Sequence, residues 1–140
     1  MLIDALRKEW IKKNDRGWDR LYIAVDLHDT LVASNYDGLA QNFYPQGIDC
    51  LKMLSQRDDI VLILWTSSYG KDSMAYTMKL KEYGIDIKYI NCNPLEENTK
   101  TGDFSRKFYF NILLDDKAGF VAETDWDVVH KFFTEHEGRL

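Results

Sequence analysis

Three groups of polar residues in this sequence each come directly after an apolar run. The groups are Asp26 after residues 21–25, Thr66 and Ser67 after residues 60–65, and Asp115 and Asp116 after residues 111–114. Carboxylates are ligands that Mg²⁺ prefers, and they repel one another unless a cation lies between them. Hydroxyl groups beside the first amides of a helix suit a phosphate, and an Asp carboxylate is a recognised covalent nucleophile. These residue types therefore predict phosphoryl-transfer chemistry with Mg²⁺.

The elements expected around these residues alternate between strands and helices. The apolar runs predict strands at residues 21–25, 60–65, 85–90 and 111–114, and helical spacing predicts helices at residues 1–13, 46–56, 72–83 and from about 124. Alternation of this kind favours an α/β fold with a mostly parallel sheet that is covered on both faces. Ligands of such sheets bind at the carboxyl ends of the strands, where all three polar groups are expected.

The totals fit one domain, residues 1–140, with residues 1–17 as an N-terminal helical extension packed on the core. Apolar residues make up 45% and charged residues 29% of the chain. No apolar run is long enough for a membrane span, the charged N-terminus is unlike a signal peptide, and Cys50 and Cys92 have no ligand-like spacing. We therefore expect a cytoplasmic protein. The net charge of −5 argues against non-specific nucleic-acid binding, but leaves open a nucleotide or a nucleic-acid end as substrate.

Four motifs in order make the sequence similar to phosphatases of the haloacid dehalogenase (HAD) superfamily. The motifs are Asp26-Leu27-His28-Asp29-Thr30, the strand ending in Thr66, Lys107 in Ser105-Arg106-Lys107, and the pair Asp115-Asp116. A group of small HAD proteins shares in particular Leu-Trp-Thr, Ser-Arg-Lys and Asp-Asp-Lys/Arg followed by a late Trp, here Trp126. The resemblance implies a three-layer, HAD-like (Rossmann-type) fold.

Roles for the motif residues follow from this resemblance. Asp26 would form an aspartyl-phosphate, Thr66 and Ser67 would bind the phosphoryl group, and Lys107 would contact both the phosphate and Asp26. Arg106 and Lys100 compete with Lys107 for the basic position. Mg²⁺ would be held by Asp26, the backbone carbonyl of His28, and Asp115, Asp116 or both.

One position departs from the family pattern. The second Asp of the first motif, which protonates the leaving group and then activates water, is replaced by His28. A histidine with an ordinary pKa near 6.5 is able to act as acid and base around neutrality, so His28 is a candidate catalytic residue. The alternative is a catalytically weakened HAD-like protein that serves as a phosphate- and metal-binding module.

The intervals in which the family places substrate-covering caps are short, at residues 33–59 and 68–106. A capless member would have an open cleft, which favours a phosphorylated substrate that is large, or a neighbouring subunit of a homo-oligomer acting as a lid. A receiver-type phospho-accepting domain is a further alternative, but in that family the acidic pair follows the first strand and the accepting Asp follows the third.

Overall fold

The computed structural model of the chain describes residues 1–35 and 37–137. Residues 34–44 are mostly polar and were expected to form a loop, and residue 36 of that loop lies outside the described residues. Residues 138–140, at the end of the expected single domain, also lie outside them. The elements are, in chain order, α1 (Leu2–Arg16), β1 (Leu21–Asp26), α2 (Pro45–Ser55), β2 (Ile60–Trp65), α3 (Gly70–Glu82), β3 (Tyr89–Ile90), β4 (Ile112–Leu114), the 3₁₀ helix η1 (Asp116–Ala118) and α4 (Ala122–Glu135).

The four strands form one parallel sheet in the order β3-β2-β1-β4. The steps from β1 to β2 and from β2 to β3 run in one direction across the sheet, so right-handed crossovers place α2 and α3 on one side of it. The return from β3 to β4 runs the other way, and residues 91–111 therefore cross on the opposite side. The α/β class and the parallel sheet predicted from the sequence are confirmed.

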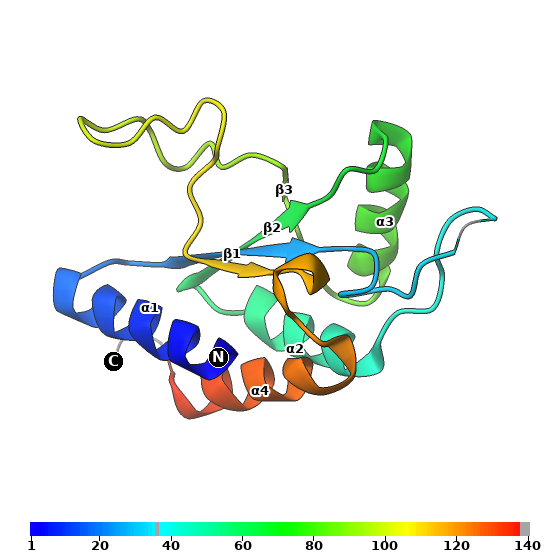
Figure 1. Cartoon of the computed structure of the whole chain (residues 1–140), viewed down its shortest axis with the longest axis horizontal. Helices are drawn as coiled ribbons and strands as arrows, with labels where there is room; N and C mark the ends of the chain where they lie inside the picture. The colour runs from blue at the N-terminus through cyan, green and yellow to red at the C-terminus, as the bar shows by residue number, and fades with distance from the viewer. Residues whose placement is uncertain (36, 138–140) are drawn as a thin grey trace.

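The two faces of the sheet are covered by different kinds of layer (Figure 1). On one face, alternate strand residues such as Ile23 and Leu62 pack with α1, α2 and α4, and Leu80 of α3 joins the same core. On the other face, Ala24 and Ile63 are covered by aromatic side chains of the irregular 91–111 segment, which carries no helix. The fold has three layers, and the third is a loop layer.

Two boundaries differ from those expected. Helix α1 continues to Arg16, where Gly17 adopts a left-handed conformation (φ 67°) and ends it. The strand expected at residues 85–90 pairs with β2 only at Tyr89 and Ile90. Ile85 and Ile87 are nonetheless buried, so their apolar alternation reflects burial without strand pairing. Within the described part of the chain, no helix has the length and apolarity that crossing a membrane requires.

Helix α1 packs against α4, β1 and β4, as expected for a helical extension on the core. The two intervals in which a cap would be inserted hold α2, α3 and β3, together with connecting loops. Neither interval forms a separate domain in the described residues. The carboxyl edge of the sheet is therefore reached without passing a cap.

Candidate functional site

Strand register brings the predicted residues together at the carboxyl edge of the sheet. Asp26 at the end of β1 is the partner of Trp65 at the end of β2, and Thr66 is the next residue. On the other side of β1, Val25 pairs with Leu114, so Asp26 and Asp115 come next in the two parallel strands. Neighbouring strands are about 4.8 Å apart. This register alone therefore places Asp26 between Thr66 on one side and the pair Asp115 and Asp116 on the other.

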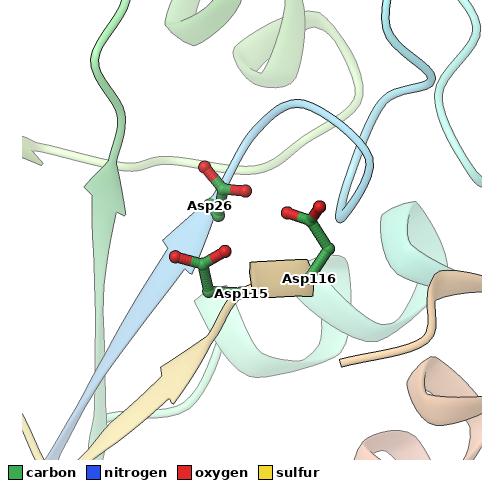
Figure 2. Close-up of side chains that lie close together, drawn as sticks. All are labelled: Asp26, Asp115 and Asp116. Atoms are coloured by element: carbon green, nitrogen blue, oxygen red, sulfur yellow. The ribbon is translucent and has the colours of Figure 1, made fainter. Parts of the chain in front are cut away.

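Three carboxylates converge at this edge (Figure 2). One carboxylate oxygen from each of Asp26, Asp115 and Asp116 lies within 4.8 Å of the others. Asp26 comes from the end of β1, Asp115 caps η1 by accepting from the Lys117 backbone amide at 2.9 Å, and Asp116 opens η1. Oxygen ligands grouped in this way, and only partly exposed, match the donor set that Mg²⁺ uses.

The electrostatics of the cluster show that it is short of positive charge. Burial raises the pKa of Asp26 to about 7, and its hydrogen bond with Asp116 and the charge of Asp115 act in the same direction. The pKa of Asp116 is lowered: burial opposes the shift, but hydrogen bonds from Asp26, Asp115 and Thr30 outweigh it. The cluster therefore retains a proton on Asp26 near neutrality, and a bound divalent cation would take over the role of that proton.

Thr30 organises the acidic cluster, a role that the sequence did not assign to it. Its buried hydroxyl lies 3.2 Å from a carboxylate oxygen of Asp26 and 3.3 Å from one of Asp116, and it accepts the Asp116 backbone amide at 2.9 Å. The indole N–H of buried Trp126 donates to the Thr30 carbonyl at 2.7 Å. Thr30 completes the first motif, so its position was the available signal. The link from α4 through Trp126 depends on the tertiary structure.

The predicted phosphate-binding residues lie at the start of α3. Thr66 is buried, and its hydroxyl donates to the Ser68 hydroxyl at 3.0 Å and accepts the Ser68 amide at 3.1 Å. Asn91, which has a left-handed backbone (φ 53°), holds Thr66 from the end of β3. Its side chain accepts the Thr66 amide at 2.8 Å and donates to the Thr66 carbonyl at 2.6 Å. Thr66, Ser67 and Asn91 all line the same cleft as Asp26. Sequence reasoning missed Asn91, although it too follows a strand.

His28 also lines this cleft, and Tyr76 of α3 holds it. The imidazole Nε2 lies 3.2 Å from the Tyr76 hydroxyl, which also accepts the Ala40 amide at 2.9 Å. Asp29, the next residue, has a left-handed backbone (φ 63°), and its carboxylate accepts the hydroxyl and amide of Ser34. Asp29 also lines the cleft, with its carboxylate engaged by Ser34.

The structure places the two adjacent candidates for the basic residue in different hollows. Lys107 does not line the cleft; it lies in a separate hollow with residues 101–104 and 108–110. Arg106, the competing candidate, lines the cleft, as does Lys117 of η1. The chain bends at residues 105–107, and of the two adjacent cations only Arg106 lines the cleft.

These residues surround an open cleft of about 860 Å³. Its lining includes the acidic groups together with Thr66, Ser67 and Arg106. In the described part of the chain, neither Arg106 nor Lys117 has a side-chain ion pair. The arrangement is able to hold a divalent cation beside an anionic group, with Asp26 next to both.

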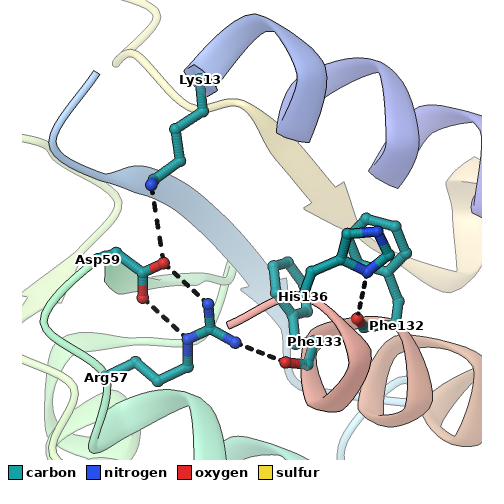
Figure 3. A network of polar contacts seen from close by, with 6 residues as sticks. All are labelled: Lys13, Arg57, Asp59, Phe132, Phe133 and His136. Atoms are coloured by element: carbon teal, nitrogen blue, oxygen red, sulfur yellow. Dashed lines mark hydrogen bonds and ion pairs between the residues drawn. The ribbon is translucent and has the colours of Figure 1, made fainter. Parts of the chain in front are cut away.

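A second polar cluster lies away from this cleft and joins three parts of the chain (Figure 3). Arg57 donates two bonds of 2.8 Å to Asp59 and one of 2.6 Å to the Phe133 carbonyl of α4. The ammonium group of Lys13 in α1 is buried and lies 3.8 Å from Asp59. Burial would raise the pKa of Asp59, but the hydrogen bonds and charge of Arg57 and the charge of Lys13 lower it. The cluster connects α1 and α4 to the turn before β2, which is a structural role.

Comparison with known proteins supports the fold. No family model and no curated protein matches the chain. A solved structure described as a conserved protein coded by a locus from Bacteroides thetaiotaomicron is similar, with 26% sequence identity and a TM-score of 0.66. The match covers 84% of this chain and 93% of the other. Because that description states no activity, the similarity supports the three-layer α/β architecture and leaves function to the site.

Proposed function

We propose that this protein is a Mg²⁺-dependent phosphohydrolase of the HAD type that acts through an aspartyl-phosphate on Asp26. The observation that carries the proposal is the convergence of three carboxylates beside Thr66 and Ser67 at one edge of the sheet. The motif order of the sequence supports the same conclusion.

The residues present fit a divalent cation. Asp26, Asp115 and Asp116 would hold it, together with the His28 backbone carbonyl, and the raised pKa of Asp26 is what a site lacking its positive charge would have. The cation would supply charge neutralisation to the carboxylates and to the non-bridging oxygens of a phosphate. Thr30 would keep Asp26 and Asp116 oriented toward it through its hydroxyl.

In the first step, a carboxylate oxygen of Asp26 would attack phosphorus while the bond from phosphorus to the leaving oxygen breaks. His28 would give a proton to that oxygen. In the second step, His28 would take a proton from water, the water oxygen would attack phosphorus, and the bond to Asp26 would break to release phosphate. Thr66, Ser67 and Arg106 would bind the phosphoryl oxygens.

Tyr76 determines which atom of His28 would move the proton. If the Tyr76 oxygen accepts the Nε2–H of His28 as well as the Ala40 amide, Nδ1 remains for proton transfer. The contact with Tyr76 also favours a second candidate, the weakened phosphate- and metal-binding module, because it occupies one of the two imidazole nitrogens. In that case Mg²⁺ and inorganic phosphate would bind together without turnover of an ester.

The test is hydrolysis of a small phosphate ester with and without Mg²⁺ over pH 5–9. We expect Mg²⁺-dependent turnover that Asp26→Asn abolishes and His28→Ala lowers by roughly 10²–10⁴-fold, the usual contribution of acid–base catalysis. Absence of Mg²⁺-dependent turnover would reject the phosphatase. Binding of Mg²⁺ with phosphate, measured by calorimetry on the same samples, would then identify the binding module.

Arg106→Ala and Lys107→Ala form a matched pair that tests which of the two is the basic residue of the site. Both remove one positive charge from adjacent residues, but only Arg106 lines the cleft. We expect the Arg106 variant to lose at least tenfold in kcat/KM and the Lys107 variant to stay within about threefold of the wild type. The reverse pattern would restore Lys107 as the basic residue of the site.

A further inference from the structure

Aromatic side chains form one wall of the cleft. Trp65, the last residue of β2, lines the cleft and keeps 37% of its surface exposed. Its ring centroid lies 5.6 Å from that of Phe108 and 6.5 Å from that of Phe110, and the two phenylalanine rings are 5.6 Å apart. Phe108 also lines the cleft and is itself buried. The indole is therefore supported from behind and leaves part of its surface to the cleft.

This wall stands one strand away from the proposed nucleophile. Trp65 is the register partner of Asp26, and the partners two residues before them, Ile63 and Ala24, both face the loop-covered side of the sheet. Because strand side chains alternate between faces, Trp65 and Asp26 point to that same side. In a ligand whose phosphate lies at Asp26, the groups attached to that phosphate would lie beside the Trp65 indole.

The same loop layer supplies a positive charge to the cleft. Arg106 lies two residues before Phe108 in the chain, and both line the cleft. The cleft thus places a guanidinium and two hydroxyl groups for an anion next to an aromatic surface for a flat group. A phosphate joined to a planar ring through a short spacer matches this combination.

We propose that the substrate class is a nucleoside phosphomonoester whose base stacks on Trp65. This inference rests on the proposed function, because it uses the same carboxylates for the phosphate. A ribose between phosphate and base spans the separation of about one strand, roughly 4.8 Å, between Asp26 and Trp65. In an aryl phosphate the ring is attached directly to the ester oxygen and would lie among the catalytic groups.

The two side-chain amides that line the cleft, of Asn91 and Asn35, are already engaged within the protein. The amide of Asn91 is engaged at both ends by Thr66. The amide of Asn35 donates to the Leu39 carbonyl and accepts the Asp37 amide. Stacking then dominates recognition, so larger purine rings should bind more tightly than pyrimidines, with adenine and guanine nearly equal.

The test measures binding separately from hydrolysis. Dissociation constants in Mg²⁺ are measured by calorimetry on the His28→Ala variant, which keeps all three carboxylates, for adenosine 5′-monophosphate, ribose 5-phosphate and O-phosphotyrosine. We expect the nucleotide to bind roughly tenfold more tightly than ribose 5-phosphate. Adding Trp65→Ala should remove that advantage, Trp65→Phe should retain part of it, and Tyr69→Ala, which removes an aromatic ring that is 83% exposed and outside the cleft, should leave it unchanged.

Three results would overturn the inference: equal affinity for the nucleotide and ribose 5-phosphate, tighter binding of phosphotyrosine than of the nucleotide, or no measurable nucleotide binding at millimolar concentration. Hydrolysis of ribose 5-phosphate by the wild type is followed in parallel. If that ester is hydrolysed and Trp65→Ala has no effect, the base-stacking inference fails while the proposed function stands. A dinucleotide bearing a 5′-phosphate then shows whether the nucleotide is taken free or at a strand end.

Discussion

Replacing Asp26 by Asn should make the protein more stable in the absence of divalent cations. In the folded protein the pKa of Asp26 is raised from 3.8 to about 7, chiefly by burial and then by the neighbouring carboxylates. Between these two pH values the folded state holds more protons than the unfolded state, so the free energy of unfolding falls as pH rises. Asn carries no charge at any pH and escapes this loss.

The size of the effect follows from the pKa difference. At about 1.4 kcal/mol per pKa unit the difference corresponds to an upper bound of about 4 kcal/mol. Asp26 is partly exposed and water screens its charge, so we expect about 1–2 kcal/mol. For a chain of 140 residues this corresponds to a rise in Tm of roughly 3–8 °C.

The assay is urea or thermal unfolding of wild type and Asp26→Asn at pH 5 and pH 8, in EDTA and in Mg²⁺. The variant should exceed the wild type most at pH 8 in EDTA. Mg²⁺ at about ten times its Kd should stabilise the wild type by about 1.4 kcal/mol and the variant by much less. Asp86→Asn is the matched control, because Asp86 is exposed and only pairs with exposed Lys88. A variant no more stable than the wild type at pH 8, or an equal response of both to Mg²⁺, would refute the cation-site reasoning.

Three further predictions concern the groups that support the site and the fold. Thr30→Val leaves a buried amide and two carboxylates without their hydroxyl partner, and should cost about 2 kcal/mol of unfolding free energy and weaken Mg²⁺ binding by calorimetry. Asp59→Asn leaves the buried ammonium of Lys13 uncompensated and should cost about 3–5 kcal/mol in urea unfolding, whereas Lys13→Met should stay within about 1 kcal/mol of the wild type. Gly47→Ala places a Cβ 2.9 Å from the Trp126 indole and should lower stability by about 1–3 kcal/mol.

Each of these has a contrasting outcome. Thr30→Ser keeps the hydroxyl and should bind Mg²⁺ as the wild type does; equal loss in both variants would point to the methyl group. If Lys13→Met destabilises as much as Asp59→Asn, the ion pair contributes more than its desolvation costs. Gly84→Ala is unsuitable as a control for Gly47→Ala because φ is 86°, but Gly70→Ala meets no neighbouring atom and serves well. An unchanged Tm for Gly47→Ala would show that the indole moves freely.

Much of the architecture could be predicted because it depends on short stretches of chain. An unbroken apolar run such as Ile60–Trp65 reports a strand that is buried on both faces. A polar residue directly after such a run marks the carboxyl edge of a parallel sheet. The expected strand at 85–90 is shorter in the structure, where only Tyr89 and Ile90 pair, because its apolar alternation reports burial and not strand pairing.

The sequence by itself determined which residue types lie at the carboxyl edge of the sheet, because each of them directly follows a predicted strand in the chain. Only the tertiary structure decided which groups of other elements meet them. Arg106 rather than Lys107 lines the cleft, the Tyr76 hydroxyl contacts the His28 imidazole, and Trp126 of the last helix donates to the Thr30 carbonyl. These pairings join residues far apart in the chain, or depend on which way an irregular segment turns. Neither leaves a periodic signal, because both are set by packing of the whole domain.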